Sequence, residues 1–114
     1  MHELGIVFHA IRTVERVGAD NGLTQVASVT LELGEVSGAI PAELVSCWDW
    51  AVQRSDLLRG AALRIETLPA VTRCGGCGQE YPTVAYGRTC PHCGSEDTWL
   101  LRGNEISIRE IEGA

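Results

Sequence analysis

The chain has 114 residues, nine basic and fifteen acidic side chains and a formal net charge of −6 at pH 7. This length suits one domain, or one domain with a small appendage. The acidic balance argues against nucleic acid and anionic membranes as partners. No apolar run approaches the roughly 18 residues of a transmembrane helix. The start shows no secretory signal, so we expect a cytoplasmic protein in reducing surroundings.

The first third of the sequence predicts a helix and then a strand. Over residues 4–18 the apolar side chains share one helical stripe, which consists of Leu4, Val7, Phe8, Ile11, Val14 and Gly18. Asn21-Gly22 supplies a stop for this helix. Residues 25–33 have a period of two, with Val29, Leu31 and Leu33 on one side and Ser28, Thr30 and Glu32 on the other. This alternation predicts a strand with one buried face.

A second helix and a second strand follow a loop at residues 34–38. The helix is expected over about residues 41–54, with Pro41 in its first turn and Glu43 near its N-terminus. Its apolar stripe consists of Leu44, Cys47, Trp48, Ala51 and Val52, so Cys47 is expected to be a buried apolar residue. Residues 62–68 alternate again, with Leu63 and Ile65 opposed to Arg64 and Glu66, and Pro69 ends that strand.

Two cysteine pairs, Cys74-Gly-Gly-Cys77 and Cys90-Pro-His-Cys93, form the strongest motif of the chain. Two residues between the members of a pair let both sulfurs face one point, and two such knuckles complete a tetrahedron of thiolates. Tetrahedral sulfur coordination selects zinc or iron. The segment is too small to fold on its apolar surface alone. Metal binding can supply roughly 10–16 kcal/mol of apparent folding free energy to such a unit.

Other roles for four cysteines remain open at this point. Two disulfides are an alternative that reducing surroundings disfavour. A nucleic-acid-binding ribbon would show a basic stripe, whereas the basic residues of 73–97 are only Arg73, Arg88 and His92. A rubredoxin-like iron protein would be coloured. Catalysis has no support, since the sequence shows no nucleophile–base pairing, phosphate loop or metalloprotease helix motif, and we do not expect an enzyme.

The C-terminal strands decide the predicted architecture. Residues 98–101 and 105–111 predict a hairpin around Gly103-Asn104, with Ile106 and Ile108 on one face of the last strand and Ile111 on the other. That strand is long and apolar enough to return to the main sheet. We therefore expect an α+β fold, with two helices packed on a small mixed β-sheet and an inserted zinc-ribbon domain that holds its ion by four cysteines. Residues 1–70 plus 104–114 form the main domain, and residues 71–103 form the ribbon.

The N-terminus holds a second candidate metal site. At a chain terminus, Met1-His2-Glu3 offers the free amine, the backbone amide of His2 and a ring nitrogen of His2 as donors. Ni²⁺ and Cu²⁺ accept square-planar nitrogen donors, whereas zinc prefers a tetrahedron. The first four amides of a helix have no intrahelical acceptor, so metal binding there breaks no helix bond. His9 is expected to be solvated, and His92 is expected at the surface of its knuckle.

Taken together, these segments resemble the HypA family of hydrogenase nickel-insertion factors. The matching segments are Met1-His2-Glu3, Glu32-Leu33-Gly34-Glu35-Val36-Ser37-Gly38, Ala62-Leu63-Arg64-Ile65-Glu66, the two cysteine knuckles, Gly103, Glu105-Ile106-Ser107-Ile108 and Ile111-Glu112. They cover essentially the whole chain. The double knuckle is generic by itself, and its combination with the terminal tripeptide and the Leu-Gly-Glu-Val-Ser-Gly segment makes the resemblance specific.

The resemblance implies a metallochaperone. It implies nickel at His2, held with the Met1 amine and the backbone at His2 and Glu3, so the main domain would be the nickel-binding domain. A structural zinc site would consist of Cys74, Cys77, Cys90 and Cys93. Family members deliver Ni²⁺ to the large subunit of nickel-iron hydrogenase with the GTPase HypB, and in some organisms they also serve urease. The protein itself is expected to be a monomer or a weak homodimer.

Overall fold

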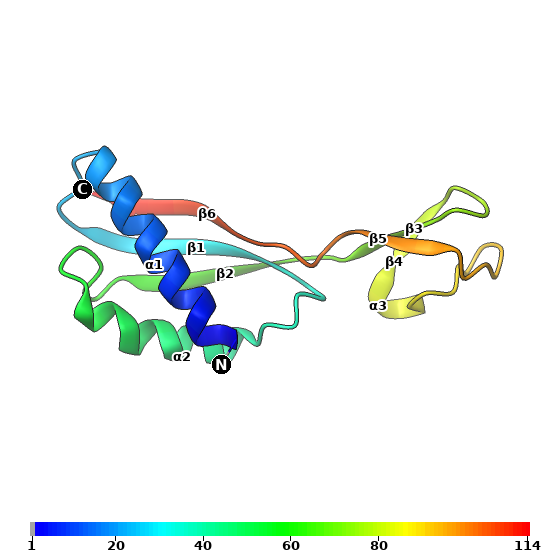
Figure 1. Cartoon of the computed structure of the whole chain (residues 1–114), viewed down its shortest axis with the longest axis horizontal. Helices are drawn as coiled ribbons and strands as arrows, with labels where there is room; N and C mark the ends of the chain where they lie inside the picture. Colours follow the sequence, from blue (N-terminus) through cyan, green and yellow to red (C-terminus); the bar gives the residue numbers. More distant parts are fainter. Residues whose placement is uncertain (1) are drawn as a thin grey trace. The chain divides into compact units, whose positions relative to one another are not determined.

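A computed structural model describes residues 2–114, except for the side chain of His2. The elements in chain order are helix α1 (His2–Asp20), strand β1 (Val26–Gly34), helix α2 (Pro41–Ala51), the 3₁₀ turn η1 (Val52–Arg54), strands β2 (Ala62–Leu68), β3 (Val71–Cys74) and β4 (Glu80–Pro82), the short helix α3 (Thr83–Tyr86), and strands β5 (Thr98–Arg102) and β6 (Ile106–Gly113) (Figure 1). The expected α+β class is confirmed. Within the described residues, no helix is both long and apolar enough to span a membrane.

The chain divides into two compact units. The first consists of Met1–Glu32, Ala39–Glu66 and Ser107–Ala114, and the second consists of Leu33–Gly38 and Thr67–Ile106. Two three-stranded sheets form, with strand orders β2-β1-β6 and β4-β3-β5. Helices α1 and α2 belong to the first unit, and the cysteines of both knuckles belong to the second.

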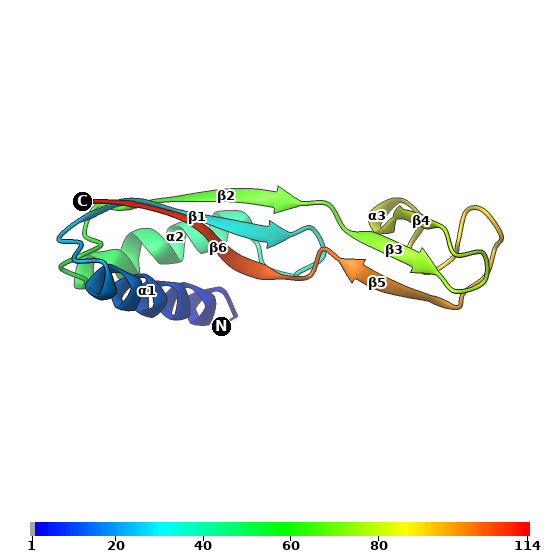
Figure 2. The same ribbon diagram turned by 90° about the horizontal axis from the view of Figure 1, so that it is seen from above.

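The sheet β2-β1-β6 is mixed, as expected. Figure 2 shows β1 and β2 running in the same direction, whereas β6 runs in the opposite direction. Two bonds between Gln25 and Ala114 confirm the antiparallel pairing next to β1, since each residue donates its amide to the carbonyl of the other. The parallel pair β1 and β2 requires a crossover connection, which α2 provides. Both helices lie on one face of this sheet (Figure 2).

Apolar side chains from the two helices and β1 form the core of the first unit. Its fully buried members include Val7, Val14, Val29, Leu31, Leu44, Trp48 and Leu58. Burying a side chain of this kind contributes about 1.5–3 kcal/mol each. The predicted stripe of α1 is confirmed at Val7, Ile11 and Val14, but its outer members differ. Leu4 is half-buried and Phe8 is 36% exposed, because they lie at the edge of the contact between α1 and α2.

The C-terminus of α1 confirms the predicted stop. Gly22 has a φ of +69°, in the left-handed region that favours glycine. The amide of Leu23 donates to the carbonyl of Gly18 at 2.8 Å, and the amide of Gly22 donates to the carbonyl of Ala19 at 3.3 Å. These two bonds are those of a Schellman motif, which satisfies the last carbonyls of the helix.

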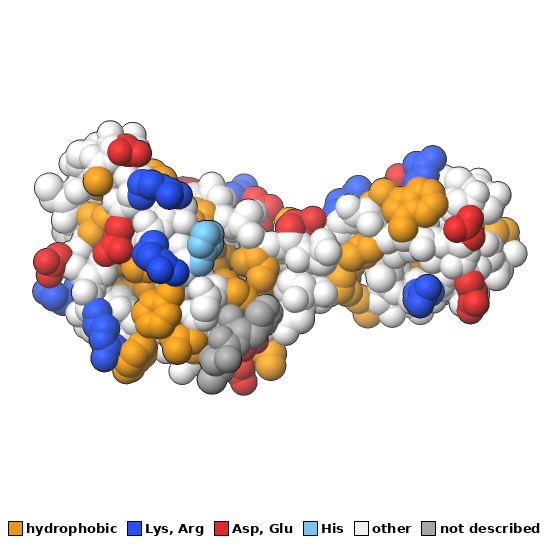
Figure 3. Space-filling model, in the orientation of Figure 1, with side chains coloured by type: hydrophobic (Ala, Val, Ile, Leu, Met, Phe, Trp, Pro, Cys, Tyr) orange, Lys and Arg blue, Asp and Glu red, His pale blue; other side chains and the backbone are white. Residues whose placement is uncertain are grey.

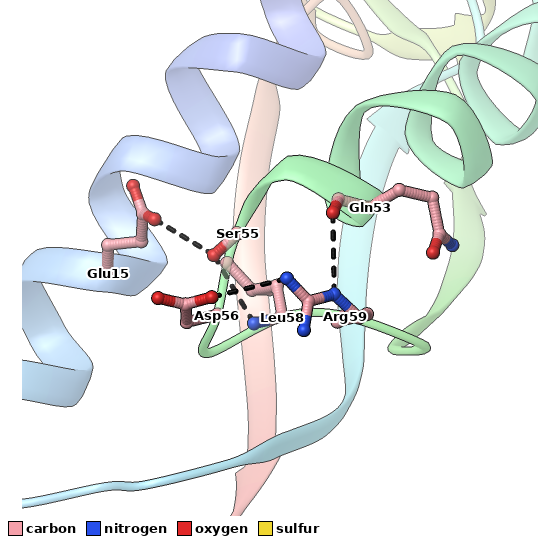
Figure 4. A network of polar contacts seen from close by, with 6 residues as sticks. All are labelled: Glu15, Gln53, Ser55, Asp56, Leu58 and Arg59. Atoms are coloured by element: carbon pink, nitrogen blue, oxygen red, sulfur yellow. Dashed lines mark hydrogen bonds and ion pairs between the residues drawn. The ribbon is translucent and has the colours of Figure 1, made fainter.

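Helix α2 begins at Pro41, as predicted, and its last turn tightens into η1. Beyond it, the Ser55 hydroxyl donates to the Glu15 carboxylate at 2.9 Å and accepts the Leu58 amide at 3.3 Å (Figure 4). This network joins the turn to α1. The expectation of a buried Cys47 is wrong, because this side chain is only half-buried. It lies one position before Trp48 on the helix, at the edge of the core stripe.

Strand β1 is buried on both faces, which corrects the prediction of one buried face. Ser28 is 3% exposed and Thr30 is 8% exposed, although both lie on the predicted polar side. The strand is central in its sheet, and ion pairs join the strands on either side of it. Arg64 of β2 pairs with Glu112 of β6, and Arg109 of β6 pairs with Glu66 of β2. Both ion pairs thus join β2 to β6 across β1, the strand that carries Ser28 and Thr30.

The predicted hairpin around Gly103-Asn104 does not form. Strand β5 pairs antiparallel with β3, whereas β6 belongs to the sheet of β1. The connecting residues bond to the end of β1 and the loop after it, with the Val36 amide donating to the Gly103 carbonyl at 2.8 Å and the Gly34 amide to the Glu105 carbonyl at 2.8 Å. Gly103 has a φ of +114°. Gly103 therefore lies where the chain passes from the sheet of β3 to the sheet of β1, and not in a tight turn between two neighbouring strands.

Candidate metal centre

Four sulfur atoms converge at one point of the second unit. The Sγ atoms of Cys74, Cys77, Cys90 and Cys93 all lie within 4.8 Å of one another. The Sγ atoms of Cys74 and Cys93 are 3.5 Å apart, and those of Cys77 and Cys90 are 3.7 Å apart. Zinc–sulfur bonds of about 2.3 Å in a regular tetrahedron place the sulfurs about 3.8 Å apart. The spacing of the thiols therefore fits a single tetrahedrally coordinated ion.

Both knuckles have the same backbone structure. In the first, the amide of Gly76 donates to Cys74 Sγ at 3.3 Å, and the amide of Gly78 donates to the Cys74 carbonyl at 2.9 Å. In the second, the amide of His92 donates to Cys90 Sγ at 3.4 Å, and the amide of Gly94 donates to the Cys90 carbonyl at 2.9 Å. Amide bonds to sulfur favour the thiolate that a metal requires.

A glycine ends each knuckle in the left-handed conformation. Gly78 has a φ of +76° and Gly94 has a φ of +75°. This conformation favours glycine and lets the chain turn tightly after the second cysteine of each pair. The first cysteine of each pair is buried and the second is exposed, so the site lies at the surface of its unit. The His92 side chain is exposed, as expected, and only its backbone supports the knuckle.

The thiols of Cys74 and Cys93 differ in pKa. A hydrogen bond from the Cys77 backbone lowers the pKa of Cys74 to about 7, although burial opposes this effect. The Ser95 amide also favours the thiolate of Cys93, but the hydrogen bond to Cys74 and burial outweigh it and raise the pKa of Cys93 to about 12. The Cys93 thiol is thus protonated near neutral pH. Metal uptake must release that proton, so the apparent metal affinity increases with pH.

Few apolar residues support this centre. The buried cluster around it consists of Cys74, Tyr81 and Cys90. Tyr81 donates its hydroxyl to the Gly87 carbonyl at 2.9 Å, and its ring meets the Tyr86 ring edge-on at 6.0 Å. Strands β4 and β5 flank β3 and hold the first knuckle in place. Two of the three buried cluster members, Cys74 and Cys90, are candidate metal ligands, so the apolar support of the ribbon is small.

The terminal candidate site falls largely outside the described residues. Met1 and the side chain of His2 are not described, and the structure places only the backbone of His2, in the first turn of α1. Glu3 is described and is only 6% exposed. Its carboxylate accepts the amide of Ile40 at 3.2 Å, directly before α2. The Glu3 side chain therefore links the start of α1 to the start of α2, a role that no local sequence pattern indicates.

Comparison with known proteins identifies the family. A family model described as "HypA: Hydrogenase/urease nickel incorporation, metallochaperone, hypA" matches residues 1–113. The chain belongs to the HypA family. It is 36% identical over 112 residues to the hydrogenase maturation factor HypA of Geobacter metallireducens, with 98% of each chain covered. It is 30% identical over 113 residues to the hydrogenase maturation factor HybF of Klebsiella pneumoniae, with 99% of each covered.

Solved HypA structures share the fold. The solution structure of the Ni metallochaperone HypA from Helicobacter pylori matches with a TM-score of 0.75 at 22% identity, covering 97% of this chain and 96% of that chain. The resemblance seen in the sequence is thus confirmed. HypA proteins are described as nickel-incorporation metallochaperones for hydrogenase, not as catalysts. The cysteine cluster of this member fits a zinc site of the ribbon type.

Proposed function

We propose that this HypA-family protein carries one Ni²⁺ ion as cargo and one Zn²⁺ ion as a permanent structural ion. The observation that carries the proposal is the family match over residues 1–113 in a chain that begins Met1-His2-Glu3. The Met1 amine, the His2 ring and the backbone at His2 and Glu3 would hold nickel. Cys74, Cys77, Cys90 and Cys93 would hold zinc.

The donors of the two sites suit these two roles. Four thiolates leave a zinc ion no open coordination position, which is typical of structural zinc. Nitrogen donors at a chain terminus suit an ion that must leave, because nickel accepts them and a terminus reaches an acceptor at little backbone cost. The burial of Glu3 supports this arrangement, since its bond to Ile40 anchors the residue next to His2. Protons compete with nickel for the amine and the imidazole, so lower pH promotes release.

Metal analysis of the untagged protein tests both assignments. We expect one zinc and one nickel per chain after nickel loading, and a colourless zinc protein before it. His2→Ala should lose the nickel and keep the zinc. His9→Ala is the matched control, because His9 is exposed on the same helix and should keep both ions. A tight equivalent of nickel in His2→Ala would show that the nickel assignment is wrong.

We also propose the acceptor and the partner. In this proposal the protein delivers nickel in the cytoplasm to the large subunit of nickel-iron hydrogenase, together with a HypB-type GTPase. Urease is a second candidate acceptor, which the description of the family model supports. Nickel-dependent activation of purified hydrogenase precursor and of purified apo-urease, each with and without this protein, would distinguish the two acceptors. No effect on either enzyme would refute the delivery step while leaving the metal sites intact.

A further inference from the structure

Helices α1 and α2 present an exposed aromatic pair to the solvent. Phe8 is 36% exposed and Trp50 is 52% exposed, and their ring centroids lie 6.4 Å apart at an interplanar angle of 72°. Apolar side chains gather over these two helices in Figure 3. Large aromatic side chains at a surface are typical of sites that bury them against a partner. We call the surface around Phe8 and Trp50 the aromatic face.

Two hollows adjoin the aromatic face. One, of about 230 Å³, is lined by Phe8, Ile11, Arg12, Glu15, Ala51, Arg54 and Ser55. The other, of about 360 Å³, is lined by Leu4, Ser46, Cys47 and Trp50. Phe8 thus borders the first hollow and Trp50 the second. Apolar side chains of a docked segment would fit on both sides of the aromatic pair.

Arginines around the aromatic face lack carboxylate partners. Of the nine arginines in the chain, five form ion pairs, namely Arg59, Arg64, Arg73, Arg102 and Arg109. Among the residues that the structure describes, Arg12, Arg16 and Arg54 pair with no carboxylate, and all three are exposed. The Arg54 guanidinium lies 3.8 Å over the Trp50 ring. Arg16 follows Arg12 by one helical turn, so the two extend along one side of α1.

This local charge runs against that of the whole molecule. The chain carries a net charge of −6, yet among the described residues three of the four arginines without an ion pair lie on α1 and η1, next to the elements that carry the aromatic pair. The one carboxylate lining the first hollow, Glu15, already accepts a hydrogen bond from Ser55. A symmetric contact between two copies would bring two arginine-bearing faces together, which like-charge repulsion disfavours. An acidic partner would instead be attracted to the aromatic face.

We propose that the aromatic face docks an acidic protein segment that carries apolar side chains. The apolar side chains enter the hollows beside Phe8 and Trp50, and the carboxylates pair with Arg12, Arg16 and Arg54. Aromatic rings and arginines contribute most of the binding energy in interfaces of this composition. None of the residues that form the aromatic face is assigned to either metal site, and only the choice of probe proteins rests on the proposed function.

Binding measurements with purified HypB-type GTPase and purified hydrogenase large-subunit precursor test this surface. We expect at least one of them to bind the full-length, zinc-loaded protein more weakly as salt increases. Trp50→Ala and the double variant Arg12→Glu/Arg54→Glu should each weaken that binding about tenfold or more. Arg88→Glu is the matched control, because Arg88 is exposed in the second unit and also lacks a carboxylate partner among the described residues.

Three outcomes would overturn the proposal. Wild-type protein could bind neither probe, or the variants could bind as tightly as Arg88→Glu. Sedimentation could also show that the variants abolish self-association, which would make a second copy the occupant of the aromatic face. Nickel and zinc content, measured on the same samples, separates this result from the proposed function. Unchanged metal content with lost binding supports the docking surface, whatever the nickel site proves to be.

Discussion

Single side chains in the first unit combine burial with a specific hydrogen bond. Trp48 is fully buried, and its indole N–H donates to the Ala61 carbonyl at 2.9 Å. The bond links α2 to the residue before β2. The Glu3 carboxylate likewise links the start of α1 to the start of α2, because it accepts the Ile40 amide. A buried donor or acceptor without its partner costs more than a hydrogen bond contributes on average. These residues therefore specify which parts of the chain meet.

Replacing Trp48 tests how much its buried hydrogen bond contributes to stability. Trp48→Phe keeps a ring in the core but leaves the Ala61 carbonyl without its donor, so we expect a loss of about 1–3 kcal/mol in the free energy of unfolding. Urea unfolding of the zinc-loaded protein, followed by circular dichroism, measures it. Trp50→Phe is the control, because Trp50 is 52% exposed and its replacement should stay within about 0.5 kcal/mol. Equal losses in both variants would contradict this account.

At the scale of elements, local chemistry sets where each helix and knuckle ends. The Schellman motif at Gly22 ends α1, and Gly78 and Gly94 close the two knuckles with nearly equal φ angles of +76° and +75°. Each turn requires a conformation that other residues adopt only with strain. Such requirements involve only neighbouring residues. The boundaries of these elements are accordingly visible in the sequence.

Alanine substitution of Gly5, inside α1, and of Gly22, just after it, should change the stability of the protein in opposite directions. Gly22→Ala must place a Cβ at a φ of +69°, and we expect a cost of about 1 kcal/mol. Gly5→Ala lies inside α1 with nothing within 4 Å of the added Cβ, so it should stabilise the protein by about 0.5–1 kcal/mol. Thermal unfolding of the two variants measures the difference. If the melting temperature shifted in the same direction in both variants, backbone conformation would not explain the change in stability.

At the scale of the molecule, the two units differ in what holds them together. The first has a core of buried aliphatic side chains and Trp48 from helices and sheet. The buried cluster of the second consists of Cys74, Tyr81 and Cys90. An apolar core supplies its own folding free energy, whereas so small a cluster depends on cross-linking by an ion. The stability of the second unit should therefore follow metal content.

Removing the metal should loosen one unit and spare the other. After chelation, or in Cys74→Ser, we expect amides of β3, β4 and β5 to lose protection from hydrogen exchange. Amides of α1 and α2 should keep their protection, because their core contains no candidate zinc ligand among the described residues. Cys47→Ser is the control and should keep its zinc and full protection of the ribbon. Persistent protection of β3–β5 in protein proven free of metal would refute the prediction.

Features that depend on neighbouring residues could be predicted from the amino-acid sequence alone. The spacing within the cysteine pairs predicted the converging thiols, because two intervening residues let a single turn bring both sulfurs together. Periods of 3.6 and two predicted α1, α2, β1 and β2. Pro41 and Gly22 marked helix ends correctly. Each of these signals acts within a few residues, so it is readable without knowing the fold.

The pairing of distant segments, in contrast, depends on the three-dimensional fold. The sequence predicts a hairpin between residues 98–101 and 105–111, yet β5 pairs with β3, because strand partners depend on contacts that no local pattern encodes. The same reason explains the second buried face of β1, because only the sheet order makes β1 the central strand. Glu3 became a buried link only because Ile40, 37 positions away, presents its amide there. Local chemistry set the elements, and long-range packing decided their partners.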